Sequence, residues 1–169
     1  MIALLVLLTG LWIRSGRIQR VPQIETCGVG AWLAQHPADS GLRLLPADSL
    51  DDTLYSQGPK GPRTPPPTQT LQGIDAEIVL ATIIDTSGNV MSTTPLKTRI
   101  SRWQGGVSPD EIRRWTPQFD TAAVKLVRNQ QYPSPTSKGN RVNALLCVTV
   151  RYEPIPVGNR FNVKVSARP

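Results

Sequence analysis

Runs of β-branched and aliphatic residues predict three strands in the second half of the chain. The runs cover residues 76–84, 90–94 and 144–152, and this composition is typical of strands with at least one buried face. A short polar turn containing Gly88 separates the first two runs, and glycine suits the positive φ that a tight turn requires. The first two runs are therefore predicted to form a β-hairpin.

A helical pattern lies between the hairpin and the last strand. Phe119, Ala123 and Val127 recur at helical spacing, so they share one face of a helix predicted over residues 119–130. Pro133 stops this helix. The order strand, strand, helix, strand predicts an α+β fold, in which a small antiparallel three-stranded sheet has one amphipathic helix packed on a face.

Residues 95–117 are predicted to be a long connection that contains one short helical turn. Ser108 is a suitable N-cap for that turn, and Pro109 suits its first position. Asp110 and Glu111 follow directly, where acidic side chains are favourable at the positive end of a helix. We therefore assign this carboxylate pair to a helix start and not to acid–base catalysis.

The start of the chain is apolar. Residues 2–13 would span about 18 Å as a helix, which is short of the ~30 Å hydrocarbon core of a membrane. We favour an export or anchoring segment, and a buried core helix is the alternative. Basic residues usually precede an export segment, and we expect a translation start upstream of Met1 to supply them. Residues 31–35 are predicted to form a short helix that ends before Pro37.

Composition divides the chain into five parts. Residues 58–70 are rich in proline and are predicted to form an extended spacer of about 40 Å. It would either reach across a gap or act as an ordinary interdomain linker. The five parts are an apolar segment with a basic flank (1–20), a poorly defined region (21–57), the Pro-rich spacer (58–70), the main domain (71–155) and a basic tail (156–169).

Charge and residue counts exclude several classes of protein. The net charge is +7, but the basic residues are dispersed and aromatic residues make up only 5%, so we expect no nucleic-acid partner. One histidine and two cysteines exclude a Cys₄ or Cys₂His₂ zinc site, and the common phosphate, dinucleotide and hydrolase motifs are absent. We expect no metal, no cofactor and no enzymatic activity, and His36 is predicted to be an exposed loop residue.

The two cysteines leave two arrangements open. Cys27 and Cys147 would form a disulfide if the chain were exported to an oxidising compartment. A buried free thiol at Cys147 is the arrangement that we favour. Cys147 lies within a predicted strand, whereas Cys27 lies before a spacer that is expected to be flexible.

The second half of the chain resembles the carboxy-terminal domain of TonB, the energy transducer of Gram-negative envelopes. The resemblance covers about 80 residues and lies in the order and spacing of short motifs, together with an apolar amino-terminal segment and a Pro-rich spacer. The motifs are the strand 78–84, the turn Asp85…Gly88-Asn89-Val90, the helix Phe119-Asp120-x-x-Ala123-x-x-x-Val127, the stop Tyr132-Pro133-x-Pro135, Gly139-x-x-Val142 and the strand Val148-x-Val150-x-Tyr152.

The resemblance implies a binding protein of the bacterial envelope, anchored in the inner membrane and facing the periplasm. Such a domain binds an extended segment of a TonB-dependent outer-membrane receptor by strand addition, and inner-membrane proton-channel motor proteins would supply the energy for transport. We expect the last strand to be the sheet edge that binds the receptor segment. Its residues are Leu146, Cys147, Val148, Thr149, Val150, Arg151 and Tyr152.

Two alternatives stay open within this interpretation. The chain could be an exported structural or adaptor module of the envelope, periplasmic after signal cleavage, with the same fold and no coupling to a motor. The side chains of Val148, Val150 and Tyr152 share one face of the strand, and ordinary core packing under the helix is the interpretation that we favour for them. An exposed edge would also permit a strand-exchanged dimer.

Overall fold

The computed structural model describes residues 28–51, 60–62, 65, 67–102, 105–154 and 161–168. The apolar run 2–13, its basic flank and Cys27 lie outside these residues. Within the described part, no helix combines the length and the hydropathy that crossing a membrane requires.

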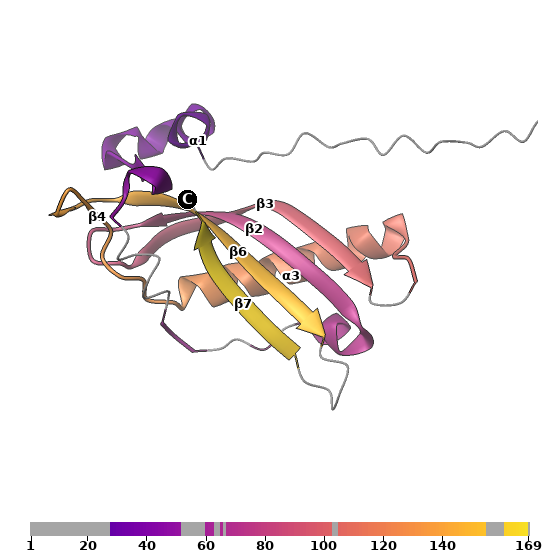
Figure 1. Ribbon diagram of the computed structural model, residues 1–169. Coiled ribbons are helices and arrows are strands. Elements are labelled where there is room, and N and C mark those ends of the chain that lie inside the picture. The colour runs from indigo at the N-terminus through magenta and orange to yellow at the C-terminus, as the bar shows by residue number, and fades with distance from the viewer. Residues whose placement is uncertain are drawn as a thin grey trace, which may run out of the picture.

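One mixed sheet forms the centre of the structure (Figure 1). Its central strand β2 pairs antiparallel with β3 on one side and with β6 on the other. On its far side, β6 pairs antiparallel with β7 and parallel with the two-residue strand β1. The strands are β1 (Leu45–Pro46), β2 (Ile74–Ile84), β3 (Val90–Arg102), β6 (Ala144–Pro154) and β7 (Phe161–Arg168).

The α+β class is confirmed, and the hairpin and the last long strand lie where the sequence predicts them. The predicted three-stranded antiparallel sheet is incomplete, because β7 and β1 also belong to the sheet. β1 pairs parallel with β6, and this pairing makes the sheet mixed. The segment 156–169, predicted to be a basic tail, contains β7. A separate small hairpin joins β4 (Thr136–Ser137) to β5 (Asn140–Arg141).

The long helix α3 (Pro109–Arg128) covers one face of the sheet, mainly over β3 and β2. It begins ten residues earlier than predicted and ends two residues earlier, while β3 extends to Arg102, so the connection expected at 95–117 is much shorter. Pro117 lies inside the helix on its exposed side. The helix continues through it because Trp115 and Phe119, on either side, are both buried against the sheet.

The opposite face of the sheet is covered at one end by the helix α1 (Val29–Gln35). This helix confirms the prediction for 31–35. Its Trp32 packs in a small core with Leu44, Ala81, Ile83 and Leu145. The region 21–57, expected to be poorly defined, is therefore ordered from residue 28 to 51, with the short helices η1 (Pro37–Leu42) and η2 (Ala47–Ser49) after α1.

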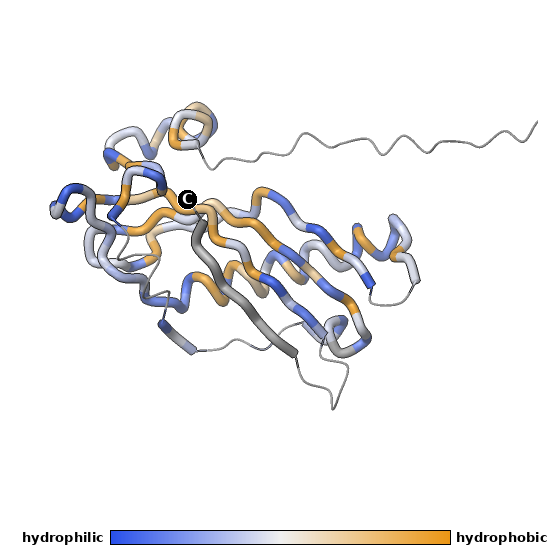
Figure 2. Tube along the Cα trace, viewed as in Figure 1, coloured by the Kyte–Doolittle hydropathy of each residue, from blue (hydrophilic) through white to orange (hydrophobic). Residues whose placement is uncertain are grey.

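Two hydrophobic cores result, one on each face. The larger lies between the sheet and α3 and includes alternate residues of β2 and β6, and the smaller lies beneath α1. Figure 2 shows the corresponding apolar stretches along β2 and β6.

The described part of the spacer makes contacts with the domain. Lys60 and Gln131 exchange two backbone hydrogen bonds, with N···O distances of 2.8 and 2.7 Å. Gln130 Nε2 donates to the carbonyl of Pro62 at 3.1 Å. A Cβ on Gly61 would lie 2.6 Å from the carbonyl oxygen of Asn129, so this approach requires glycine. The spacer then enters β2 through the short helix η3 (Thr68–Gln72).

Candidate functional site

The strand β6, which carries all the predicted binding residues, lies inside the sheet. β2 pairs with it from Ala144 to Tyr152, and β7 pairs with it from Cys147 to Pro154 on the other side. β1 pairs with the same side at Ala144 and Leu145. The expectation that residues 144–152 form an open edge is therefore wrong, because a strand outside the predicted domain covers that edge.

Alternate side chains of β6 face the two sides of the sheet. Leu146, Val148, Val150 and Tyr152 belong to the core beneath α3, and all four are completely buried. This confirms core packing as their role. Cys147, Thr149 and Arg151 face the opposite side.

Tyr152 is the largest fully buried side chain of the described part of the molecule. Its ring lies 5.7 Å from that of Phe119, centroid to centroid, in a tilted arrangement. Burial raises the pKa of the Tyr152 hydroxyl far above its usual range, and this hydroxyl makes no hydrogen bond within the part of the chain that the structure describes. Tyr152 is thus a residue of the core beneath α3.

Cys147 is not a free thiol, which corrects the arrangement that we favoured. It is disulfide-bonded, and the described part of the chain contains no free cysteine. The one other cysteine in the sequence is Cys27.

Beyond the small core beneath α1, the same face of the sheet becomes strongly polar. A groove of about 480 Å³ lies there, across β3, β2 and β6. Side chains and backbone from all three strands line it: Asp75, Ala76, Glu77, Arg99, Ser101, Arg151, Tyr152, Glu153 and Pro154.

Charges in this groove are arranged by cross-strand register. Glu77 on β2 lies opposite Arg151 on β6 and opposite Arg99 on β3. Its carboxylate forms an ion pair with Arg151, in which Nη2 and Oε2 are 2.5 Å apart. Burial raises the pKa of Asp75, and the neighbouring Glu153 carboxylate raises it further.

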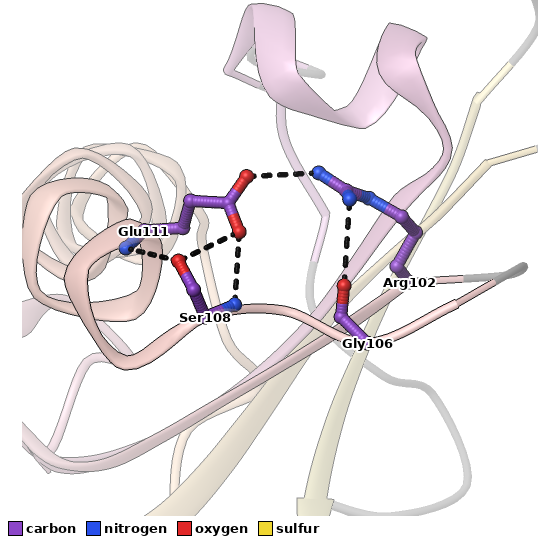
Figure 3. A network of polar contacts seen from close by, with 4 residues as sticks. All are labelled: Arg102, Gly106, Ser108 and Glu111. Atoms are coloured by element: carbon purple, nitrogen blue, oxygen red, sulfur yellow. Dashed lines mark hydrogen bonds and ion pairs between the residues drawn. The ribbon is translucent and has the colours of Figure 1, made fainter.

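The carboxylate pair Asp110–Glu111 belongs to the start of α3, as predicted. The backbone N–H of Ser108 donates to Glu111 Oε2 at 2.8 Å, and Glu111 N donates to Ser108 Oγ at 3.2 Å, which forms a capping box (Figure 3). Glu111 also forms an ion pair with Arg102 of β3 at 3.1 Å. The hydrogen bonds from Ser108, and then Arg102, lower the pKa of the Glu111 carboxyl.

Three segments that are distant in sequence meet at the other end of the molecule. The N–H of Tyr132 donates to the carbonyl of Gly88 at 3.0 Å, and Gln131 Nε2 donates to the carbonyl of Ser87 at 3.0 Å. The same Gln131 pairs with Lys60 of the spacer. The Tyr-Pro stop therefore anchors both the hairpin turn and the spacer, which is a structural role.

His36 is half-buried rather than exposed. Its ring stacks on that of Trp32, with centroids 3.7 Å apart and planes inclined by 12°. Trp32 Nε1 donates to Asp39 Oδ2 at 2.7 Å. Among the described residues, no group of three or more His, Cys, Asp or Glu side chains is placed to bind a metal ion.

Sequence reasoning missed the strand β7 and the groove. Phe161, Val163 and Val165 alternate with polar residues, which is the period of a strand and was the available signal for β7. The groove had no such signal, because its residues come from three strands and meet only through the register.

No family model matches the sequence, and neither a curated protein nor a solved structure matches it.

Proposed function

We propose that this chain is a TonB-like binding domain of the bacterial envelope. It binds an extended segment of an outer-membrane receptor by strand addition to its sheet and transmits energy for transport across the outer membrane. Binding through backbone hydrogen bonds requires no catalytic group.

The observation that carries the proposal is the pairing of β7 with β6. Eight residues of β7 pair antiparallel with β6. They lie along the same edge of β6 to which, by the resemblance, a receptor segment would bind. β7 follows β6 among the described strands, after the six residues 155–160. β6 therefore pairs with a further strand on this side, and we expect a receptor segment to bind there by displacing β7.

The disulfide at Cys147 supports the proposed location. Disulfides form and persist in oxidising compartments such as the periplasm and are rare in the cytosol. A bond at Cys147 is therefore consistent with an exported domain.

The test is binding of peptides from the periplasmic amino termini of outer-membrane receptors of the same genome. The full chain is compared with the variant Val165→Pro, in which proline removes a backbone donor from β7 and disfavours its pairing. If β7 and the receptor segment compete, the variant binds at least about tenfold more tightly, since a larger fraction of its molecules has a free β6 edge. NMR shifts report the contact on residues 144–154.

Val165→Thr is the matched control, because threonine keeps a high strand propensity. It should bind as the unmodified chain does. Absence of peptide binding to both the full chain and the Val165→Pro variant, with the fold of each intact by NMR, would exclude the receptor-binding proposal.

A structural or adaptor module of the envelope is the second candidate, and closure of the β6 edge by β7 is the observation that favours it. In that case β7 is a permanent strand of the sheet. Hydrogen exchange separates the two: β7 amides that exchange only with global unfolding favour the adaptor, and amides that exchange much faster favour a displaceable strand.

A further inference from the structure

The outer edge of β3 is a second, separate edge of the sheet. β3 is the longest strand and pairs only with β2, and no other described segment pairs with its far side. Its backbone groups on that side are therefore able to pair with a further strand.

Two basic residues lie along this edge, on the face that carries the groove. Lys97 and Arg99 are opposite Val79 and Glu77 in the register, and within the described part of the chain neither forms an ion pair with a carboxylate. Arg99 is exposed, and Lys97 is half-buried. Glu77 is closer to Arg151, so Arg99 remains available.

The third basic residue of this stretch is already engaged. Arg102 forms an ion pair with Glu111 and donates to the carbonyl of Gly106 at 3.4 Å (Figure 3). Its guanidinium also lies 5.9 Å from the ring centroid of Trp115. Arg102 thus ties the end of β3 to α3. The charges free to recognise a partner are those of Lys97 and Arg99.

The pattern across the sheet indicates which charge would fit beside β3. Along one row the side chains alternate in sign, from Arg99 on β3 to Glu77 on β2 and Arg151 on β6. An acidic residue on an added strand, placed opposite Arg99, would continue this alternation. Opposite charges on directly paired strands are stabilising, and like charges are destabilising.

The same residues disfavour other occupants. Pro95 lacks a backbone donor and lies at an irregularity in the pairing with β2, and Lys97 and Arg99 repel a second copy of this edge. We propose that residues 96–102 bind an extended segment of a partner protein that carries acidic side chains at alternate positions. This surface is distinct from the β6 edge, so it does not depend on the function proposed above.

The test uses the full chain and two synthetic ten-residue peptides of identical composition. In one, glutamate alternates with threonine and valine; in the other, the same glutamates stand in adjacent pairs separated by two uncharged residues, so that no two glutamates are spaced i, i+2. Strand addition predicts that the alternating peptide binds at least about fivefold more tightly, because only this peptide places a glutamate opposite both Lys97 and Arg99. It also predicts slower amide exchange at residues 96–102.

Two charge reversals locate the contact. Arg99→Glu should weaken binding of the alternating peptide by at least about fivefold. Arg114→Glu makes the same change of charge at an exposed position of α3. It should change the affinity for the alternating peptide by less than about twofold. The fold of each variant is checked by NMR.

Three outcomes would overturn the proposal. Equal affinity for the two peptides, or equal losses in the two variants, would show only general attraction of anions to a basic protein. Unchanged amide exchange at 96–102 would place the peptide elsewhere. Protection of these amides that grows with protein concentration, without peptide, would show that a second copy occupies the edge.

Discussion

At the scale of single residues, the most constrained position in the described structure is Gly88. Its φ is +86°, which glycine adopts readily and other residues rarely do. A Cβ there would lie 2.0 Å from the carbonyl oxygen of Tyr132. The turn therefore requires glycine both for its backbone conformation and for the close approach of a distant segment.

Gly88→Ala should lower the free energy of unfolding by about 2–4 kcal/mol, since alanine adds backbone strain and a clash with backbone. Gly139→Ala is the control, because Gly139 has a similar φ of +77° but open space around its Cβ position. It should cost only about 1 kcal/mol. Denaturant unfolding measures both, and equal losses would show that the contact with Tyr132 does not constrain Gly88.

At the scale of elements, the sequence predicted those parts of the fold that rest on local pattern. The apolar runs of β2 and β6, the hairpin turn and the second half of α3 all follow from spacing and composition. The first half of α3 was not predicted as a helix, because residues 95–117 were expected to form a connection with one short helical turn. In the structure the burial of Trp115 continues the helix through this segment.

The candidate site was less predictable than the elements that form it. Residues 144–152 were correctly expected to be a strand, but whether a strand lies at an edge depends on distant segments. β7 pairs with β6 through backbone hydrogen bonds. These bonds do not depend on the identity of the side chains of β6, so the sequence of β6 does not predict the pairing. Likewise, Arg99 and Glu77 meet through a register that includes an irregularity between Val79 and Leu80.

The start of α3 gives a pH-dependent prediction at this scale. Folding lowers the pKa of Glu111, so its ionised form stabilises the folded state above the unfolded value of 4.5. This contribution should be lost as the pH falls below about 4.5 and through the lower pKa of the folded state. Glu111→Gln should therefore be less stable than the unmodified chain at pH 7 and nearly equal to it at pH 2. Thermal unfolding at both pH values measures this, and a difference that persists at pH 2 would contradict it.

At the scale of the whole molecule, the sheet is covered by different elements on its two faces. Among the described residues, α3 covers one face of the sheet, whereas α1 covers only one end of the other face. The uncovered part of that second face holds the groove and borders the open edge of β3. The groove is polar because this part of the face is in contact with solvent, and β2 and β6 place charged residues there.

Reduction of the disulfide tests how far the bond at Cys147 contributes to stability. A reducing agent should lower the free energy of unfolding by about 2–4 kcal/mol, since the bond restricts the unfolded chain. Denaturant unfolding with and without reductant measures the change. Cys147→Ser should be insensitive to reductant, and a reductant effect that persists in this variant would show that the change has another origin.

The packing of residues 28–51 also decides how a pull on the amino-terminal side would travel through the protein. Trp32 of α1 packs in one core with residues of β2 and β6, and β1 pairs with β6 at Ala144 and Leu145. Both contacts come before the spacer 58–70 in the chain. Tension that arrives at residue 28 would therefore enter the sheet at β2 and β6 before it reaches the spacer.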